Sequence, residues 1–293
     1  MAAPGNNNQP GKKDRREAAR EKARLEREAE KRRQRRNRIF IQGGIGIVVL
    51  AIVAVIALVI VNVNKPAGPG PLNMASDGIL LTGSNMDATK TAAIKAGATP
   101  TVTDKSKHKT TVNIVTYIDY QCPYCEQFET TNADQIATWV KAGEATIEIH
   151  PIAILDSSSL GNKYATRAAN AAACVANYDP NNFYAVNTAL YANQPAENTS
   201  GKSDTELLST VSGAGSGSAK IKSCITSQQF VPWVTAATAR VHPNGDKNVF
   251  AGVANTPAKF GGTPTVFVNG VQYTGSLTDA TAFASFTAQQ VTG

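Results

Sequence analysis

The stretch VNIVTYIDYQCPYC, residues 112–125, decides the fold of this chain. Residues 112–118 form an apolar, β-branched run that predicts a buried strand. A helix is predicted from residue 126 to about residue 141, so Cys122 and Cys125 stand at a junction from strand to helix. Two cysteines separated by two residues at such a junction form a dithiol that can close and reopen. The stretch therefore predicts a redox site.

The helix start indicates which sulfur reacts. A helix N terminus presents N–H groups without partners and the positive end of the helix dipole, and both lower the pKa of a thiol there. Pro123 fits the first turn because its fixed φ suits a helix and its missing N–H would have no partner there. We expect Cys122 to attack or be attacked, and Cys125 to resolve the mixed disulfide. The alternatives are a static disulfide or half of a zinc site, which would need a second close pair or a Cys/His cluster.

A second motif, GGTPTVFVNGVQY, occupies residues 261–273. The β-branched run after Pro264 predicts a strand, and Asn269-Gly270 is a hairpin turn signal in front of a second strand. A proline cannot donate to a ladder, so Pro264 belongs at the head of the first strand.

The order of expected elements is strand, Cys-x-x-Cys, helix, strand, helical region, Thr-Pro, hairpin and helix, which resembles a thioredoxin fold of the α/β class. The segment IDYQCPYCEQF, residues 118–128, resembles the DsbA-like branch in particular, in its membrane-anchored form from actinobacteria and other Gram-positive bacteria. The resemblance covers residues 78–291. It implies a cis bond before Pro264 in a loop that faces the dithiol. It also implies that the Thr263 backbone hydrogen-bonds an extended substrate peptide.

Two positions depart from relatives. Many thioredoxin-fold enzymes carry a buried carboxylate six residues before the first cysteine, where this chain has Thr116. Proton transfer to and from Cys125 then needs another group or water. The DsbA of enteric bacteria has His between its cysteines where this chain has Tyr124, and a neutral Tyr stabilises the Cys122 thiolate less. We also expect Pro123 and Tyr124 to contact the substrate.

The N-terminal part predicts membrane attachment. Residues 39–61 are apolar except for Gln42, and 23 residues suffice to cross a bilayer of about 30 Å. Residues 1–38 carry 14 Lys and Arg against 6 Asp and Glu, a net charge of +8, whereas the whole chain carries +7. This asymmetry predicts a cytoplasmic tail with the large C-terminal part outside. The alternatives are a cleavable signal peptide, whose apolar core would be shorter, and a nucleic-acid-binding tail, which would interleave aromatic residues.

The remaining two cysteines fit an extracytoplasmic location, where disulfides form and persist. Cys174 and Cys224 lie in two helical stretches, and we predict a structural bridge between them. Some actinobacterial DsbA-like proteins are similar in having a second bridge in the helical region. The bridge would close a loop of 51 residues, for which the chain-entropy model gives about 4 kcal/mol. Two free buried thiols are the alternative.

We expect four segments along the chain. They are a basic cytoplasmic tail at residues 1–38, a transmembrane signal anchor at 39–63, a linker and N-terminal extension at 64–109, and a thioredoxin-like domain at 110–293 with an Ala-rich helical insertion at about 160–255. Within the extension, one short helix is expected around residues 90–96.

The pattern favours a membrane-anchored, extracytoplasmic thiol–disulfide oxidoreductase that introduces disulfides into reduced exported proteins. The resemblance implies a membrane reoxidase of DsbB-like or VKOR-like type as partner. No metal, organic cofactor or nucleic acid is implied. A reductase or an isomerase would use the same chemistry, and the sequence separates these directions poorly. A membrane-tethered peptide-binding chaperone with a vestigial Cys-x-x-Cys is the alternative from another class.

Overall fold

We describe a computed structural model of the chain, which divides into two units, Met1–Lys65 and Pro66–Gly293. The described residues of the second unit are 68–108, 111–241, 249–256 and 258–292. Those of the first unit are Glu21, Arg24, Arg27, Glu30, Lys31 and Arg32, which are helical and exposed. The membrane span expected at residues 39–63 lies outside this set. Among the described residues, no helix is both long enough and apolar enough to cross a bilayer.

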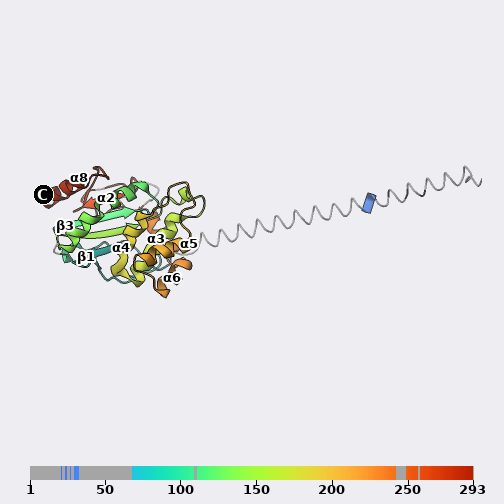
Figure 1. The fold of residues 1–293 in the computed structure, drawn as a ribbon, viewed down its shortest axis with the longest axis horizontal. Helices are drawn as coiled ribbons and strands as arrows, with labels where there is room; N and C mark the ends of the chain where they lie inside the picture. Colours follow the sequence, from blue (N-terminus) through green and yellow to red (C-terminus); the bar gives the residue numbers. More distant parts are fainter. Residues whose placement is uncertain are drawn as a thin grey trace, which may run out of the picture. The chain divides into compact units, whose positions relative to one another are not determined.

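The second unit is built on a mixed sheet, in which the described strands follow the order β2-β1-β4-β3-β5-β6 (Figure 1). The strands are β1 (Ile79–Thr82), β2 (Asp87–Ala88), β3 (Val112–Ile118), β4 (Ala145–Pro151), β5 (Thr265–Val268) and β6 (Val271–Gln272). β3 and β4 run parallel, whereas β1 and β5 run antiparallel to their neighbours. This is the α/β architecture that the sequence predicts.

The strand β3 lies inside the sheet because both of its faces are apolar. Ile114 and Ile118 are completely buried on one face, and Val115 and Tyr117 are almost completely buried on the other. A strand that is covered on both faces is expected to have a near-continuous apolar run. The bounds predicted from the sequence, residues 112–118, are those of β3.

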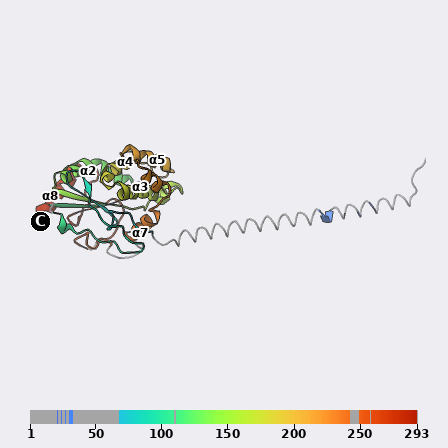
Figure 2. The same ribbon diagram turned by 90° about the horizontal axis from the view of Figure 1, so that it is seen from below.

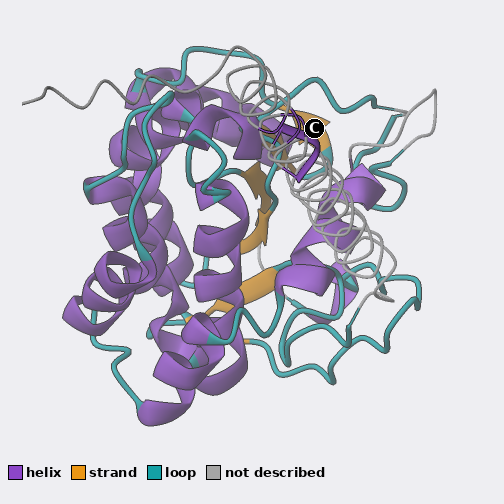
Figure 3. Cartoon of the chain, turned by 90° about the vertical axis from the view of Figure 1, so that its right-hand side faces the viewer, coloured by secondary structure: helices purple, strands orange, loops and turns teal. Residues whose placement is uncertain are grey.

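Helices occupy the residues between β4 and β5, where the Ala-rich sequence predicts a helical insertion. They are α3 (Tyr164–Tyr178), α4 (Phe183–Ala192), α5 (Asp204–Gly213), α6 (Ala219–Thr226) and α7 (Val231–Val241), with the short 3-10 turns η2 (Asp156–Ser159) and η3 (Pro180–Asn182) before α3 and α4. Figure 2 shows α3, α4 and α5 along one side of the domain and α7 along the other. The strands therefore lie between helices, as Figure 3 shows.

Two further helices belong to the core of the fold. The first, α2 (Pro123–Lys141), spans the crossover between the parallel strands β3 and β4, a connection that is too long for a simple turn. The second, α8 (Ala280–Thr292), follows the β5–β6 hairpin and lies at the end of the domain opposite α5 and α6 (Figure 1). The rings of Phe128 in α2 and Phe283 in α8 meet edge-on at 5.2 Å, so both helices share one buried cluster.

A disulfide fastens the helical insertion. Cys174 of α3 is bonded to Cys224 of α6, with the two Cα atoms 5.8 Å apart. Both residues are buried. The predicted bridge is therefore present.

Residues 68–108, which the sequence predicts to be a linker and an extension, contribute to the same sheet. β1 pairs with β4 and β2 pairs with β1, so two strands precede residue 110. The buried Glu148 of β4 accepts hydrogen bonds from Ser76 and Thr103, and Asp77 forms an ion pair with Arg240 of α7. These contacts hold the segment against β4 and α7.

The helix expected around residues 90–96 is not formed. The N–H of Asn73 bonds to the carbonyl of Thr91, and the N–H of Gly70 bonds to the carbonyl of Ile94. Tertiary hydrogen bonds therefore replace the local ones that a helix would make.

We predict that the double variant Cys174→Ala, Cys224→Ala unfolds at lower denaturant concentration than the unsubstituted protein. The loss in free energy of unfolding should be about 2–5 kcal/mol, because the open chain gains the entropy that a loop of this length restricts. Equilibrium unfolding in urea measures it. The alkylation rate of Cys122 serves as the control and should not change. An unchanged midpoint would contradict the stabilising role of the bridge.

Candidate active site

The dithiol lies where β3 leads into α2. Cys122 is the N-cap residue of α2, and Pro123 occupies the first turn. Cys122 and Cys125 are free thiols, and Cys122 is 4% exposed whereas Cys125 is completely buried. The N–H groups of Cys125 and Glu126 both bond to the carbonyl of Cys122, so the hydrogen bonding of the helix begins at this residue. The helix thus places one sulfur at its N terminus and the other one turn inside the protein.

The loop before β5 meets the dithiol. β5 pairs with β3, and Thr265 stands opposite Tyr117, so the residues before β5 lie at the end of β3 that leads to Cys122. The Thr263–Pro264 bond is cis, as the family resemblance implies. The thiol of Cys122 donates a hydrogen bond to the Thr263 carbonyl oxygen at 3.2 Å. The sheet therefore brings together the two motifs that the sequence analysis selects.

The surroundings of Cys122 favour its thiolate. A hydrogen bond with the Cys125 side chain makes the largest contribution to lowering the pKa of Cys122, which falls to about 6. The Thr263 side chain and the N–H groups of Cys125 and Tyr124 act in the same direction, and burial opposes it. Thiolates at helix N termini are stabilised in this way. These contacts therefore favour ionisation of Cys122 at a lower pH than that of an ordinary thiol.

Cys125 has the opposite environment. Complete burial is the main cause that raises the pKa of Cys125 well above that of an ordinary thiol, and a hydrogen bond to Cys122 adds to it. A buried thiol with a raised pKa keeps its proton and is a poor nucleophile until the proton is removed. The two cysteines are therefore suited to the two roles expected from their positions.

Asp119, three residues before Cys122, connects several parts of the site. Its buried carboxylate accepts hydrogen bonds from the N–H groups of Gln121, Ile154 and Leu155 at 2.8–3.0 Å. Burial raises the pKa of Asp119 to about 7, and the three N–H groups oppose that shift. Its own N–H lies 3.5 Å from the sulfur of Cys125. The carboxylate thus ties the loop that carries Cys122 to the segment after β4.

A second buried carboxyl group, Glu129, lies in α2 one turn beyond Cys125. Its Oε2 atom accepts a hydrogen bond of 3.1 Å from Asn187 of α4, and Asn187 in turn accepts one of 2.9 Å from the Tyr120 hydroxyl. Burial raises the pKa of Glu129 to about 7. Glu129 belongs to none of the motifs that the sequence carries. A weak sequence signal is its spacing of four residues from Cys125, which places both on one helix face.

The rim of the site is held by Gln194, which follows α4. Its side chain donates hydrogen bonds to the carbonyl oxygens of Tyr120 and Cys122 at 3.1 and 3.0 Å. Gln121 donates a hydrogen bond to the carbonyl of Ser158, which lies in η2. These contacts come from segments distant in sequence, so no local pattern predicts them.

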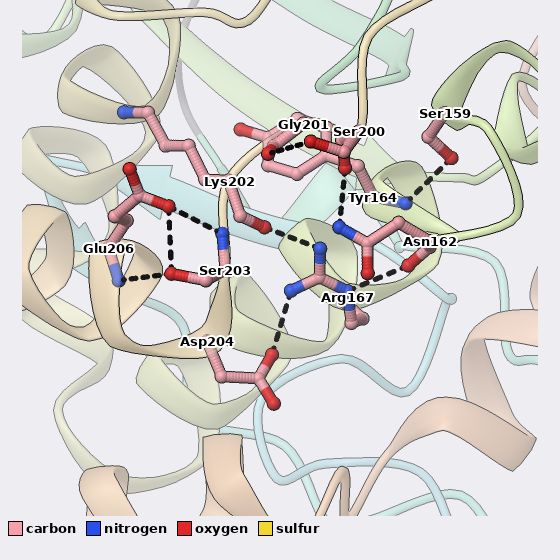
Figure 4. Close-up of polar contacts among 10 residues, drawn as sticks. All are labelled: Ser159, Asn162, Tyr164, Arg167, Ser200, Gly201, Lys202, Ser203, Asp204 and Glu206. Carbon is pink, nitrogen blue, oxygen red and sulfur yellow. Dashed lines mark hydrogen bonds and ion pairs between the residues drawn. The ribbon is translucent and has the colours of Figure 1, made fainter.

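The segment after Gln194 is fastened by Arg167 of α3 (Figure 4). Its guanidinium group donates to the carbonyl oxygens of Asn162 and Lys202 and forms an ion pair with Asp204 at 2.8 Å. The guanidinium group therefore joins the start of α3 to the start of α5.

The residues expected to bind substrate either follow Cys122 in α2 or belong to the loop whose Thr263 carbonyl bonds to Cys122. Thr263 and Pro264 come from the cis-proline loop, Pro123 is half-buried, and Tyr124 is 60% exposed. Their roles in binding stay predictions. Within the described residues, no group of three or more His, Cys, Asp or Glu side chains is arranged to hold a metal ion.

Comparisons with known proteins place this site in a family. The profile of the family described as Thioredoxin matches residues 106–285, which is more than half of the chain. No curated protein matches the chain.

Solved structures resemble the domain. Oxidised DsbA of Mycobacterium tuberculosis is 27% identical, with a TM-score of 0.53, over 74% of this chain and 94% of that chain. The reduced disulfide bond oxidoreductase DsbG of Mycobacterium tuberculosis is 25% identical, with a TM-score of 0.51, over 74% and 88%. Oxidised BdbD of Bacillus subtilis, at 15% identity and a TM-score of 0.51, covers 78% and 100% and shares the fold. The chain belongs to the thioredoxin family and is a protein disulfide oxidoreductase of the DsbA-like type.

Proposed function

We propose that this chain is a membrane-anchored, extracytoplasmic oxidoreductase that introduces disulfides into exported proteins through Cys122 and Cys125. The single observation that carries the direction of the reaction is the contrast between the two sulfurs. The Cys122 thiolate is stabilised in the reduced protein, whereas no such stabilisation exists once its sulfur is bonded. A stabilised reduced form makes a dithiol a strong oxidant.

The reaction follows from the positions of the two sulfurs. A substrate thiolate attacks the sulfur of Cys122, a bond between the two forms, and the Cys122–Cys125 bond breaks with its electron pair on Cys125. The second thiolate of the substrate then attacks the substrate sulfur that is bonded to Cys122. The substrate leaves oxidised, and both cysteines of the enzyme are reduced. A membrane reoxidase of DsbB-like or VKOR-like type would accept the two electrons and restore the disulfide.

Membrane attachment is the second part of the proposal, and the sequence of the N-terminal part supports it. An apolar stretch of 23 residues follows a tail with a net charge of +8. We predict that the full chain sediments with membranes and resists extraction by high salt. A variant that lacks residues 1–63 should be found in the soluble fraction. Salt-extractable full-length protein would contradict the anchor.

The reduction potential of Cys122–Cys125 tests the direction. In the full-length protein equilibrated against glutathione buffers, we expect a value near that of DsbA, about −120 mV. A value near that of thioredoxin, about −270 mV, would contradict the oxidase and support the reductase. A binding module with a vestigial motif predicts that Cys122→Ser retains full activity in cells, whereas the oxidoreductase predicts complete loss.

The ionisation of Cys122 can be followed by its alkylation rate in the reduced protein. The rate should rise with pH to a plateau, with a midpoint at about 6. In Cys125→Ala the midpoint should move upward, because the hydrogen bond that contributes most to the low pKa is removed. Thr226→Ala, a change in α6 far from the dithiol in the chain, is the control. A midpoint near 8.5 in the unsubstituted protein, the value of an ordinary thiol, would contradict the argument.

The lowered pKa of Cys122 also predicts how the free energy of unfolding depends on pH. The folded protein lowers the pKa of Cys122, so ionisation stabilises the reduced form fully above the ordinary thiol pKa of about 8.5. This stabilisation is lost as the pH falls through about 6. The unfolding free energy of the reduced form, relative to the oxidised form, should therefore decrease between about pH 8 and about pH 5.

A further inference from the structure

The buried Cys125 needs a partner that exchanges protons with it. When the Cys122–Cys125 bond breaks, the electron pair remains on Cys125, whose buried sulfur is unstable as a thiolate. When the bond forms again, the Cys125 thiol must lose its proton before it attacks. At the position six residues before Cys122 stands Thr116, whose buried hydroxyl has no hydrogen-bond partner and cannot act as a carboxylate would.

Asp119 is poorly suited to this exchange. Its two carboxylate oxygens accept three N–H groups, from Gln121, Ile154 and Leu155. A protonated oxygen loses acceptor capacity, so protonation would weaken the bonds that hold the loop before Cys122. The Asp119 carboxylate therefore stabilises the loop before Cys122 and is a poor proton carrier for Cys125.

Glu129, unlike Asp119, can be protonated without weakening a hydrogen bond that holds the loop before Cys122. It lies four residues after Cys125 on the same buried face of α2, where side chains have Cβ atoms about 5–6 Å apart. One of its oxygens accepts the hydrogen bond from Asn187, and the described residues include no salt bridge to it. Protonation of the other oxygen leaves that hydrogen bond intact. A buried carboxyl group without a cation is readily protonated near neutral pH.

A cavity connects Glu129 to the surface. Its volume is about 220 Å³, and it lies between α2 and α4 with Glu129 and Tyr191 among its lining residues. Thr130, Asp134 and Thr188 also line the cavity, and all three are exposed. Water in this cavity can therefore exchange protons with the carboxyl group while the dithiol stays buried.

We propose that Glu129 gives a proton to Cys125 and takes a proton from it. Glu129 in turn exchanges protons with water through this cavity. The inference rests on the proposed function, in which Cys122 and Cys125 form a redox dithiol. As the enzyme disulfide opens, the Glu129 carboxyl group gives its proton to the Cys125 thiolate and regains one from the cavity. As the disulfide closes, the Glu129 carboxylate takes the proton from the Cys125 thiol. The resulting thiolate attacks Cys122, and the group bonded to Cys122 leaves with the electron pair.

The closing step can be measured in the full-length protein. The reduced enzyme is mixed with a saturating concentration of oxidised glutathione, quenched with acid, and analysed by mass spectrometry. The Cys122–glutathione intermediate decays by the attack of Cys125, and its decay rate is followed from about pH 5 to about pH 9. The Cys122 thiol is bonded throughout this step, so its own ionisation does not contribute.

In the unsubstituted protein, we expect the decay rate to rise with pH and to level off above the pKa of Glu129, about 7. In Glu129→Gln, which keeps an acceptor for Asn187, the levelling should disappear. The rate should be about 100-fold lower at neutral pH, the usual contribution of a general base. Asp134→Asn, a matched change at the rim of the same cavity, should keep the profile of the unsubstituted protein.

Two results would overturn the inference. One is a decay rate in the unsubstituted protein that rises tenfold per pH unit through the neutral range without levelling, a result that requires no variant to fold. The other is a Glu129→Gln profile equal to that of the unsubstituted protein. Failure of the redox dithiol, on which the inference rests, is a different result, because then no glutathione intermediate converts to the Cys122–Cys125 disulfide at any pH.

Discussion

The parallel pairing of β3 with β4 is the constraint on which the site depends. A parallel pair needs a long crossover, and here the crossover is α2, whose N terminus must begin where β3 ends. Cys122 occupies that point, so its sulfur lies beside the N–H groups of Tyr124 and Cys125 in the first turn of α2. The antiparallel addition of β5 to the other side of β3 then brings the Thr263 carbonyl to the same place. Two hydrogen-bonding patterns of the sheet thus determine the surroundings of one sulfur atom.

The same geometry separates the chemistry of the two cysteines. One turn of α2 carries Cys125 from the helix start into the hydrophobic core, where burial raises its pKa while the pKa of Cys122 falls. The reduced form is stabilised only if the proton remains on the inner sulfur and the charge on the outer one. A buried proton, however, must enter and leave during each cycle. The cavity beside Glu129 meets this requirement without exposing the dithiol.

The fold was predictable where local signals are strong, and the site was predictable in part. The run at β3, the Cys-Pro-Tyr-Cys junction and the Thr-Pro hairpin each carry a local pattern, and the structure places them as expected. The segment at residues 90–96 was expected to be helical, but its backbone bonds to residues 70–73 instead. Whether those distant partners are available depends on the whole fold. No short window of sequence contains that information.

The same limit applies to the polar residues around the dithiol. Asp119 looks like an ordinary turn residue until Ile154 and Leu155 donate to it across the sheet. Gln194 has no motif, although its side chain binds the carbonyl of Cys122. Glu129 carries a weak signal, because a carboxylate on the apolar face of an expected helix conflicts with the pattern around it. Such conflicts between local pattern and global burial occur most often at functional sites.

The composition of α3 gives a physical reason for the disulfide that joins α3 to α6. Thirteen of its fifteen residues are buried, and seven of these are alanines. Small side chains allow neighbouring helices to approach closely, but each buries less apolar surface than a leucine would and contributes less to stability. The Cys174–Cys224 bond crosses from this helix to α6 and restricts the unfolded chain instead. A cross-link that is independent of apolar area therefore stabilises the part of the domain in which that area is small.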